Sequence, residues 1–107
     1  MSEDLRKAYK CVDLMNEVMG FDVRERIRDS KHSWARNMLV YKLLDYKLTL
    51  EQIGEVISRD HSTVVNCRLQ SCLAMEAPKL YPDAMDIWNR FNERLSLEKN
   101  RYYEEIF

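Results

Sequence analysis

The sequence predicts an all-α fold, on the strength of its size, its composition and the spacing of its apolar residues. A chain of 107 residues is the size of one domain, and 46% hydrophobic with 33% charged residues is typical of globular proteins. Two glycines and two prolines leave few residues for hairpins or glycine-rich phosphate loops. Apolar residues recur every three or four positions, which is the period of amphipathic helices. We therefore expect one helical domain over residues 1–107.

The first predicted helix spans residues 4–19. Its apolar residues share one face, and Gly20 follows at the place where a left-handed C-cap commonly ends a helix. After it, Asp22 and Glu25 have the spacing of a capping box, so that a short helix is expected over residues 23–28.

One further helix and a pair of helices joined by a short turn follow in the middle of the chain. The polar stretch 29–33 is expected to separate the short helix from a helix over residues 34–46. Thr49 is a good N-cap for a short helix, and Asp60 is a good N-cap for the next, which runs to about Met75. Two helices joined by such a short turn are the helix-turn-helix pattern, which many helical corners share.

The last predicted helix carries a narrow apolar stripe. It follows a break marked by two prolines, Pro78 and Pro82. Its apolar residues follow one another at intervals of four, three, four and seven: Ala84, Trp88, Phe91, Leu95 and Tyr102. A stripe of this width either folds back against the first helix of the same chain or pairs with a second copy, which would make a homodimer. The spacing leaves both arrangements open.

Charge is distributed unevenly although the chain as a whole is nearly neutral. The net charge is −1, but residues 24–73 carry nine basic and six acidic residues, whereas each flanking segment is net acidic. Much of the basic excess precedes the helix pair, at Arg24, Arg26, Arg28, Lys31 and Arg36. We expect this charge beside the helix pair, where it either binds phosphates or covers a solvated helix face.

Short polar side chains begin the second helix of the pair. Residues at this end of a recognition helix reach base edges in the major groove. Asp60 suits a cytosine amino group, and His61 and Ser62 suit a hydrogen bond or a thymine methyl group. Thr63, at the helix N-terminus, suits a phosphate. Without further context, ordinary helix capping accounts for Asp60, Ser62 and Thr63, and a solvated surface position accounts for His61.

Three ordered motifs supply that context. Residues 35–38 read Ala-Arg-Asn-Met, residues 50–54 read Leu-Glu-Gln-Ile-Gly, and residues 59–64 read Arg-Asp-His-Ser-Thr-Val. In this order they resemble the Ala-Arg-Gln-x-Ala-x-Tyr-Leu, Ser-Leu-x-x-Ile-Gly and Arg-Asp-His-Ser/Thr-Thr-Val segments of the C-terminal DNA-binding domain of the bacterial replication initiator DnaA. The likeness spans about residues 21–73.

The resemblance implies a fold and a function. The implied fold is a helical bundle with a Trp-repressor-like helix-turn-helix core over residues 21–75, extended by an N-terminal helix over 1–20 and a C-terminal helical segment over 76–107. The implied partner is double-stranded DNA, read through the major groove while an arginine enters the adjacent minor groove. The implied DNA-binding residues are Arg28, Arg36, Asn37, Arg59, Asp60, His61, Ser62, Thr63 and Asn66.

Roles within this set follow from the same resemblance. The implied base readers are Asp60, His61 and Ser62. The implied contacts to the DNA backbone are Arg36, Asn37 and Thr63. Arg28 best matches the minor-groove arginine, and Arg26 is a close substitute.

The sequence also departs from the family pattern. Between Gly54 and Arg59 lie four residues, one fewer than usual in the family and none of them glycine. Asn66 stands where the family often has histidine, and Gln70 stands where it has a basic residue. These changes are expected to weaken phosphate binding and to alter the preferred site.

Other function classes find little support in the residues. There is no G-x-x-x-x-G-K-[ST] motif for ATP, no Cys-rich or His-rich spacing for a metal, and no nucleophile beside an evident base, so we expect neither an enzyme nor a cofactor. Three cysteines without a CxxC pair indicate reduced thiols, and no apolar run approaches a membrane span.

We therefore expect a cytoplasmic, nucleoid-associated protein that regulates replication initiation or transcription. The alternative is a helical interaction module that has lost base readout and binds a protein through Trp88 and Phe91.

Overall fold

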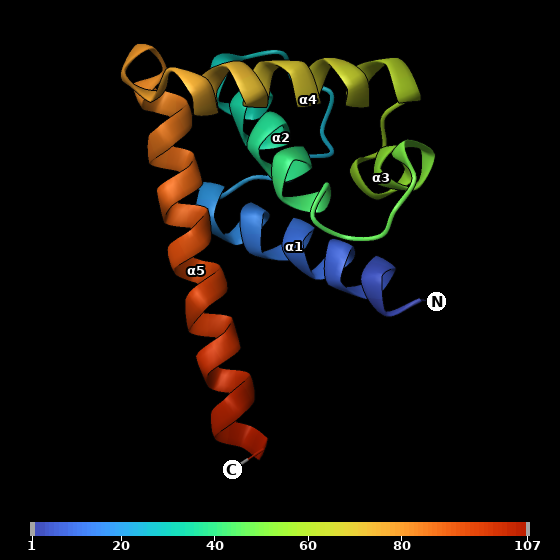
Figure 1. The fold of residues 1–107 in the computed structure, drawn as a ribbon, viewed down its shortest axis with the longest axis vertical. Coiled ribbons are helices and arrows are strands. Elements are labelled where there is room, and N and C mark those ends of the chain that lie inside the picture. Colours follow the sequence, from blue (N-terminus) through green and yellow to red (C-terminus); the bar gives the residue numbers. More distant parts are fainter. Residues whose placement is uncertain (1, 107) are drawn as a thin grey trace.

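The computed structural model confirms the all-helical class. It describes the backbone of residues 2–106 and the side chains of residues 2–99, and no strand occurs within these limits. The elements are α1 (Glu3–Met19), α2 (Ser30–Leu43), α3 (Leu50–Ile57), α4 (His61–Glu76), the 3₁₀ helix η1 (Pro78–Leu80) and α5 (Pro82–Ile106) (Figure 1).

Helix α2 lies at the centre of the fold. It packs against α1, α3, α4 and α5. In Figure 1, α4 crosses above α2, α1 crosses below it, and α3 and α5 lie at opposite ends. The largest side chains that are fully buried among these helices include Met15, Met38, Leu39, Leu43, Ile53, Ile57 and Phe91. The resulting core fixes how α3 and α4 sit relative to the loop that enters α2.

Several predicted helix ends are confirmed by their caps. Gly20 takes the left-handed conformation at the end of α1, with φ of 76°. Thr49 and Gln52 form a capping box at the start of α3. Asp60 caps α4. The caps place these helices within a residue or two of the expected bounds because each cap depends on neighbouring residues alone.

The predicted short helix over residues 23–28 is wrong. Only one of the two hydrogen bonds of a capping box forms, from the Asp22 amide to the Glu25 carboxylate at 3.2 Å, while the Glu25 amide donates to the main-chain carbonyl oxygen of Asp22 and closes a single turn. The chain then continues without helical structure to Asp29. The carbonyl oxygens of Val23 and Ile27 accept hydrogen bonds from a distant arginine instead of from amides four residues further on.

Helix α2 begins and ends earlier than predicted. Asp29 is its N-cap, with a carboxylate oxygen 2.8 Å from the His32 amide nitrogen. The polar stretch that was expected to be a loop is therefore the cap and first turn of α2. The helix ends at Leu43, where tighter turns take over to Tyr46.

Helix α5 folds back onto its own chain. Its residues Ala84 and Phe91 are fully buried, and Trp88 is half-buried with its ring edge-on to Tyr41 at 5.3 Å between centroids. Lys10 and Glu98 form an ion pair of 3.3 Å between α1 and α5. The predicted stripe is thus covered within one chain over these positions. Tyr102 lies outside the residues whose side chains are described, and a homodimer through α5 stays a prediction.

Candidate functional site

The turn between α3 and α4 depends on a close approach at Gly54. The Arg59 amide donates a hydrogen bond to the Gly54 carbonyl oxygen at 2.8 Å. A Cβ atom on residue 54 would lie 2.5 Å from the Arg59 carbonyl oxygen, a distance that requires the backbone to move. Ser58 takes the left-handed conformation, with φ of 57°, at the position that ends α3. The turn therefore lacks a glycine but keeps the backbone conformation that glycine favours.

The first turn of α4 presents polar groups to solvent. The Asp60 carboxylate accepts from the Thr63 amide at 2.8 Å. Hydrogen bonds from the Thr63 side chain and amide lower the pKa of Asp60, so that the carboxylate is ionised near neutral pH. His61 and Ser62 are exposed. Capping by Asp60 is thus confirmed, while base reading by these residues stays a prediction.

Arg36 lies in the interior beneath the loop that precedes α2. Its side chain is 7% exposed. Its guanidinium donates to the carbonyl oxygens of Val23 at 3.3 Å, Glu25 at 3.2 Å and Ile27 at 3.0 Å. The guanidinium therefore positions the loop, and the contact with the DNA backbone expected of Arg36 stays a prediction.

Arg59 holds the same loop from the turn before α4. Its guanidinium donates to the carbonyl oxygens of Arg24 at 2.9 Å and Glu25 at 2.7 Å. The Glu25 carbonyl therefore accepts from both Arg36 and Arg59. Burial lowers the pKa of Arg36, and the positive charge of Arg59 lowers it further. We call this arrangement the arginine clamp: Arg36 and Arg59 on the main chain of residues 23–27.

A cavity of about 330 Å³ opens beside the arginine clamp. Its lining consists of Arg26, Ile27, Arg28, Arg36, Arg59 and Thr63. Arg26 and Arg28 are exposed, and no acidic residue belongs to the lining. Positive charge thus collects where α4 begins, which suits a phosphate or another anion. Since both exposed arginines line the cavity, either one remains a candidate for the minor groove.

A groove of about 320 Å³ between α2 and α4 adjoins this cavity and shares Arg36 and Thr63 with it. Its lining consists of Ser33, Trp34, Arg36, Asn37, Thr63, Asn66, Cys67 and Gln70. Asn37 is only 8% exposed, whereas Asn66 is exposed, and the contact with the DNA backbone expected of Asn37 stays a prediction. The cavity and the groove together bring six of the nine predicted residues to one face.

Three predicted residues lie next to this face without lining it, and five lining residues were not predicted to bind DNA. Asp60, His61 and Ser62 occupy the cap and first turn of α4. The residues missed were Ile27, Ser33, Trp34, Cys67 and Gln70. Ser33 lies one helical turn before Asn37, on the same side of α2. This neighbour was missed because the helix was predicted to begin at Trp34, whereas it begins at Ser30.

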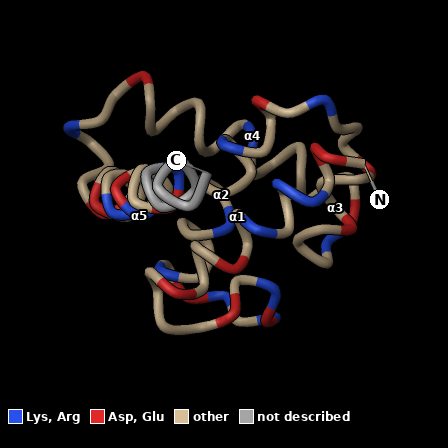
Figure 2. The backbone as a smooth tube through the Cα atoms, turned by 90° about the horizontal axis from the view of Figure 1, so that it is seen from below, with Lys and Arg blue, Asp and Glu red and all other residues tan. Residues whose placement is uncertain are grey.

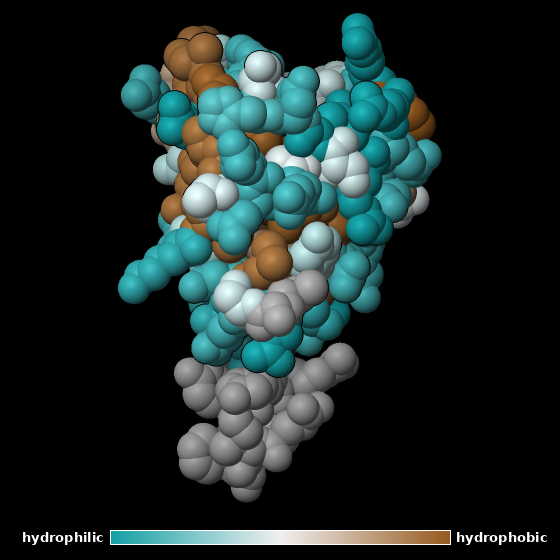
Figure 3. Space-filling view, turned by 90° about the vertical axis from the view of Figure 1, so that its right-hand side faces the viewer, coloured by the Kyte–Doolittle hydropathy of each residue, from teal (hydrophilic) through white to brown (hydrophobic). Residues whose placement is uncertain are grey.

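The positive charge at this site is a local feature. Basic and acidic residues are interspersed along the backbone, with no side of the chain carrying one sign alone in the view from below (Figure 2). The side of α3 and of the start of α4 is largely hydrophilic, with hydrophobic residues gathered along one edge (Figure 3). Any anion would therefore be attracted by the arginine-lined cavity itself and only weakly by the whole molecule.

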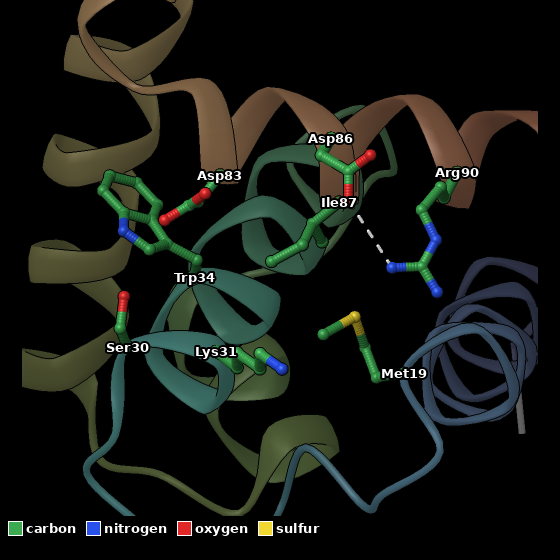
Figure 4. A pocket seen from close by; sticks show the side chains of 8 residues that line it. All are labelled: Met19, Ser30, Lys31, Trp34, Asp83, Asp86, Ile87 and Arg90. Carbon is green, nitrogen blue, oxygen red and sulfur yellow. Dashed lines mark ion pairs between the residues drawn. The ribbon is translucent and has the colours of Figure 1, made fainter.

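A second cavity, of about 400 Å³, lies between the end of α1, the start of α2 and the start of α5 (Figure 4). Its lining consists of Met19, Ser30, Lys31, Trp34, Asp83, Asp86, Ile87 and Arg90. Asp86 and Arg90 form an ion pair of 3.6 Å on one wall. Charges of both signs and apolar side chains share this lining, so it favours no single class of ligand.

Among the described residues, none of the helices combines the length and the hydrophobicity that a membrane span requires. Comparison with known proteins adds no family, because neither a family model, nor a curated protein, nor a solved structure matches the chain.

Proposed function

We propose that the protein binds double-stranded DNA sequence-specifically through α3, the turn and α4, acting as a helix-turn-helix of the Trp-repressor type. The observation that carries the proposal is the position of the arginine-lined cavity directly beside the exposed first turn of α4. Positive charge positions a protein on the DNA backbone, and short polar side chains at a helix N-terminus reach base edges.

The arginine clamp supports this proposal by fixing the loop relative to α4. Arg26 and Arg28 belong to a loop whose main chain is tied to the turn residue Arg59. An arginine on such a loop reaches an adjacent minor groove while α4 occupies the major groove. The loop needs no ordering on binding, which removes an entropic cost.

The resemblance to the DnaA C-terminal domain supports the same function on independent grounds. The motif over residues 59–64 supplies the turn and the first turn of α4, and the motif over residues 50–54 supplies Gly54 at its close approach. On this reading the protein acts in the control of replication initiation or of transcription.

Burial weighs against the alternative of a protein-interaction module that uses the stripe of α5. Phe91 is fully buried, and Trp88 is half-buried against Tyr41. A partner would have to displace contacts within the chain to reach these rings.

In-vitro selection from randomised duplexes tests the proposal. We expect enrichment of one short site, to which Ser62→Ala binds about 5- to 150-fold more weakly, corresponding to roughly 1 to 3 kcal/mol for one base contact. Ser96→Ala, an exposed serine on α5, is the matched control and should bind like the wild type. Failure to enrich any sequence, or equal losses from both serine variants, would contradict the proposal.

A further inference from the structure

Helix α4 has an outward face that continues from its first turn. The residues of α4 that are buried in the core are Val64, Cys67, Ser71 and Ala74. On the opposite side, three to four residues apart, lie Ser62, Val65, Asn66 and Leu69. This i, i+3, i+4, i+7 spacing is the one by which the recognition helix of a homeodomain reads bases. The face therefore extends two helical turns beyond the predicted base readers.

Apolar side chains occupy this face. Leu69 is 56% exposed, Leu73 one turn further is 40% exposed, and Val65 is half-buried. Single exposed leucines are common on proteins, but here they lie on one helix in line with Ser62.

The same helix is almost free of charge. Charged residues make up 33% of the chain, yet between His61 and Met75 the sequence contains Arg68 and no other lysine, arginine, aspartate or glutamate. A helix face meant for water normally carries charges of both signs. A face without acidic residues, flanked by the exposed arginines of the cavity, suits a polyanion that displays apolar groups.

We propose that Leu69, with Val65 beside it, contacts thymine methyl groups in the major groove, so that the target site carries thymine at the facing positions. The inference rests on the proposed DNA-binding function. The thymine C5-methyl is the apolar group that base pairs display in the major groove. The other bases present donors and acceptors, which an aliphatic side chain would leave without partners.

Replacing thymine by deoxyuridine tests the inference, because it removes the methyl group and keeps the hydrogen-bonding edge. In the selected duplex, thymines are replaced one at a time and the Kd is measured by fluorescence anisotropy. For the wild type we expect the Kd to rise about fourfold at one or two positions, as for one buried methyl group. Leu69→Ala should abolish this difference at one of them.

Leu80→Ala is the matched control, since Leu80 is a leucine on η1 that is 76% exposed. It should retain the preference for thymine over deoxyuridine. Both variants should unfold at the temperature of the wild type within a few degrees, because each side chain is exposed.

The outcomes separate the inference from the function beneath it. If the wild type binds its selected duplex but tolerates deoxyuridine at every position, the thymine contact is refuted while DNA binding stands. If no duplex is selected, both are refuted. Retained methyl discrimination in Leu69→Ala would also overturn the inference. The inference would likewise be overturned if Leu69→Ala still discriminated against deoxyuridine but no longer self-associated in sedimentation velocity. That result would assign the face to a second copy of the chain.

Discussion

Replacing Arg36 by methionine should release the loop at residues 22–28 from the helices that carry it. Methionine has a similar length and fits a buried site, but it donates no hydrogen bond. The carbonyl oxygens of Val23 and Ile27 would lose their bonds to Arg36, while that of Glu25 would keep its bond to Arg59. The change therefore removes half of the arginine clamp and leaves the turn before α4 in place.

The magnitude follows from the bonds that are lost. Each hydrogen bond from a charged donor contributes roughly 1.5 to 3 kcal/mol, so three bonds set an upper limit well above the net effect. Methionine avoids the cost of burying a guanidinium, the cost that also lowers the pKa of Arg36. We expect the free energy of unfolding to fall by about 2 to 4 kcal/mol, as for one partner lost from a buried polar network.

Urea unfolding followed by circular dichroism measures this change, and amide hydrogen exchange locates it. Exchange should rise over residues 22–28 more than in α3 or α5. Arg6→Met, an exposed arginine on α1, is the matched control and should change stability by less than about 0.5 kcal/mol. If Arg36→Met is as stable as this control and its loop amides exchange as in the wild type, the positioning role of Arg36 is refuted.

Four further outcomes are expected from the turn, the cap and the charge of the site. Gly54→Ala should destabilise the protein by roughly 1 to 3 kcal/mol in urea unfolding, because its Cβ would lie 2.5 Å from the carbonyl oxygen of Arg59; a neutral effect would contradict that close approach. Ser58→Gly should raise the free energy of unfolding by about 0.5 to 1 kcal/mol, since it relieves a left-handed residue, and a loss of stability would argue against that conformation. The Asp60 cap, whose pKa is lowered, stabilises the fold above the ordinary aspartate pKa of about 3.9 and is lost as the pH falls further. Asp60→Asn, which keeps a capping oxygen, should therefore flatten the acid side of a pH titration of stability, and an unchanged acid limb would exclude this contribution. If four to six phosphates are neutralised, the logarithm of DNA affinity should fall against the logarithm of salt concentration with a slope of about −4 to −5, whereas a slope near zero would rule out the proposed docking.

The helices could be predicted because their signals are local. Thr49 and Asp60 cap helices through groups three residues away, and Gly20 ends α1 through its own backbone. The loop at residues 22–28 could not be predicted in this way. The loop carbonyl oxygens that accept hydrogen bonds from Arg36 lie 9 to 13 residues before it in the sequence, and those that accept from Arg59 lie 34 or 35 residues before it. A local capping-box pattern starts a helix only where no distant donor competes for the same carbonyl oxygens.

The site was predicted in its composition and less well in its burial. The sequence predicts the residues of α4 near the basic segment, and Arg28, Thr63 and Asn66 do meet around the cavity and groove. Arg36 lies among apolar residues of α2, but nothing in the sequence around one arginine shows whether its side chain is buried or exposed. The burial of Arg36 could therefore not be predicted. The partner of the apolar stripe on α5 could not be predicted for a similar reason. The same spacing of apolar residues suits packing against α1 and packing against a second copy of the chain.

The two arginines of the arginine clamp bind the loop only through hydrogen bonds to its main-chain carbonyl oxygens. Every amino acid offers such an oxygen, so the path of the loop does not depend on which side chains it carries at positions 26, 27 and 28. Those three side chains are exposed and lie outside the clamp. The loop is therefore a natural site for grafting: a library randomised at these positions would change what the loop touches while keeping where it sits.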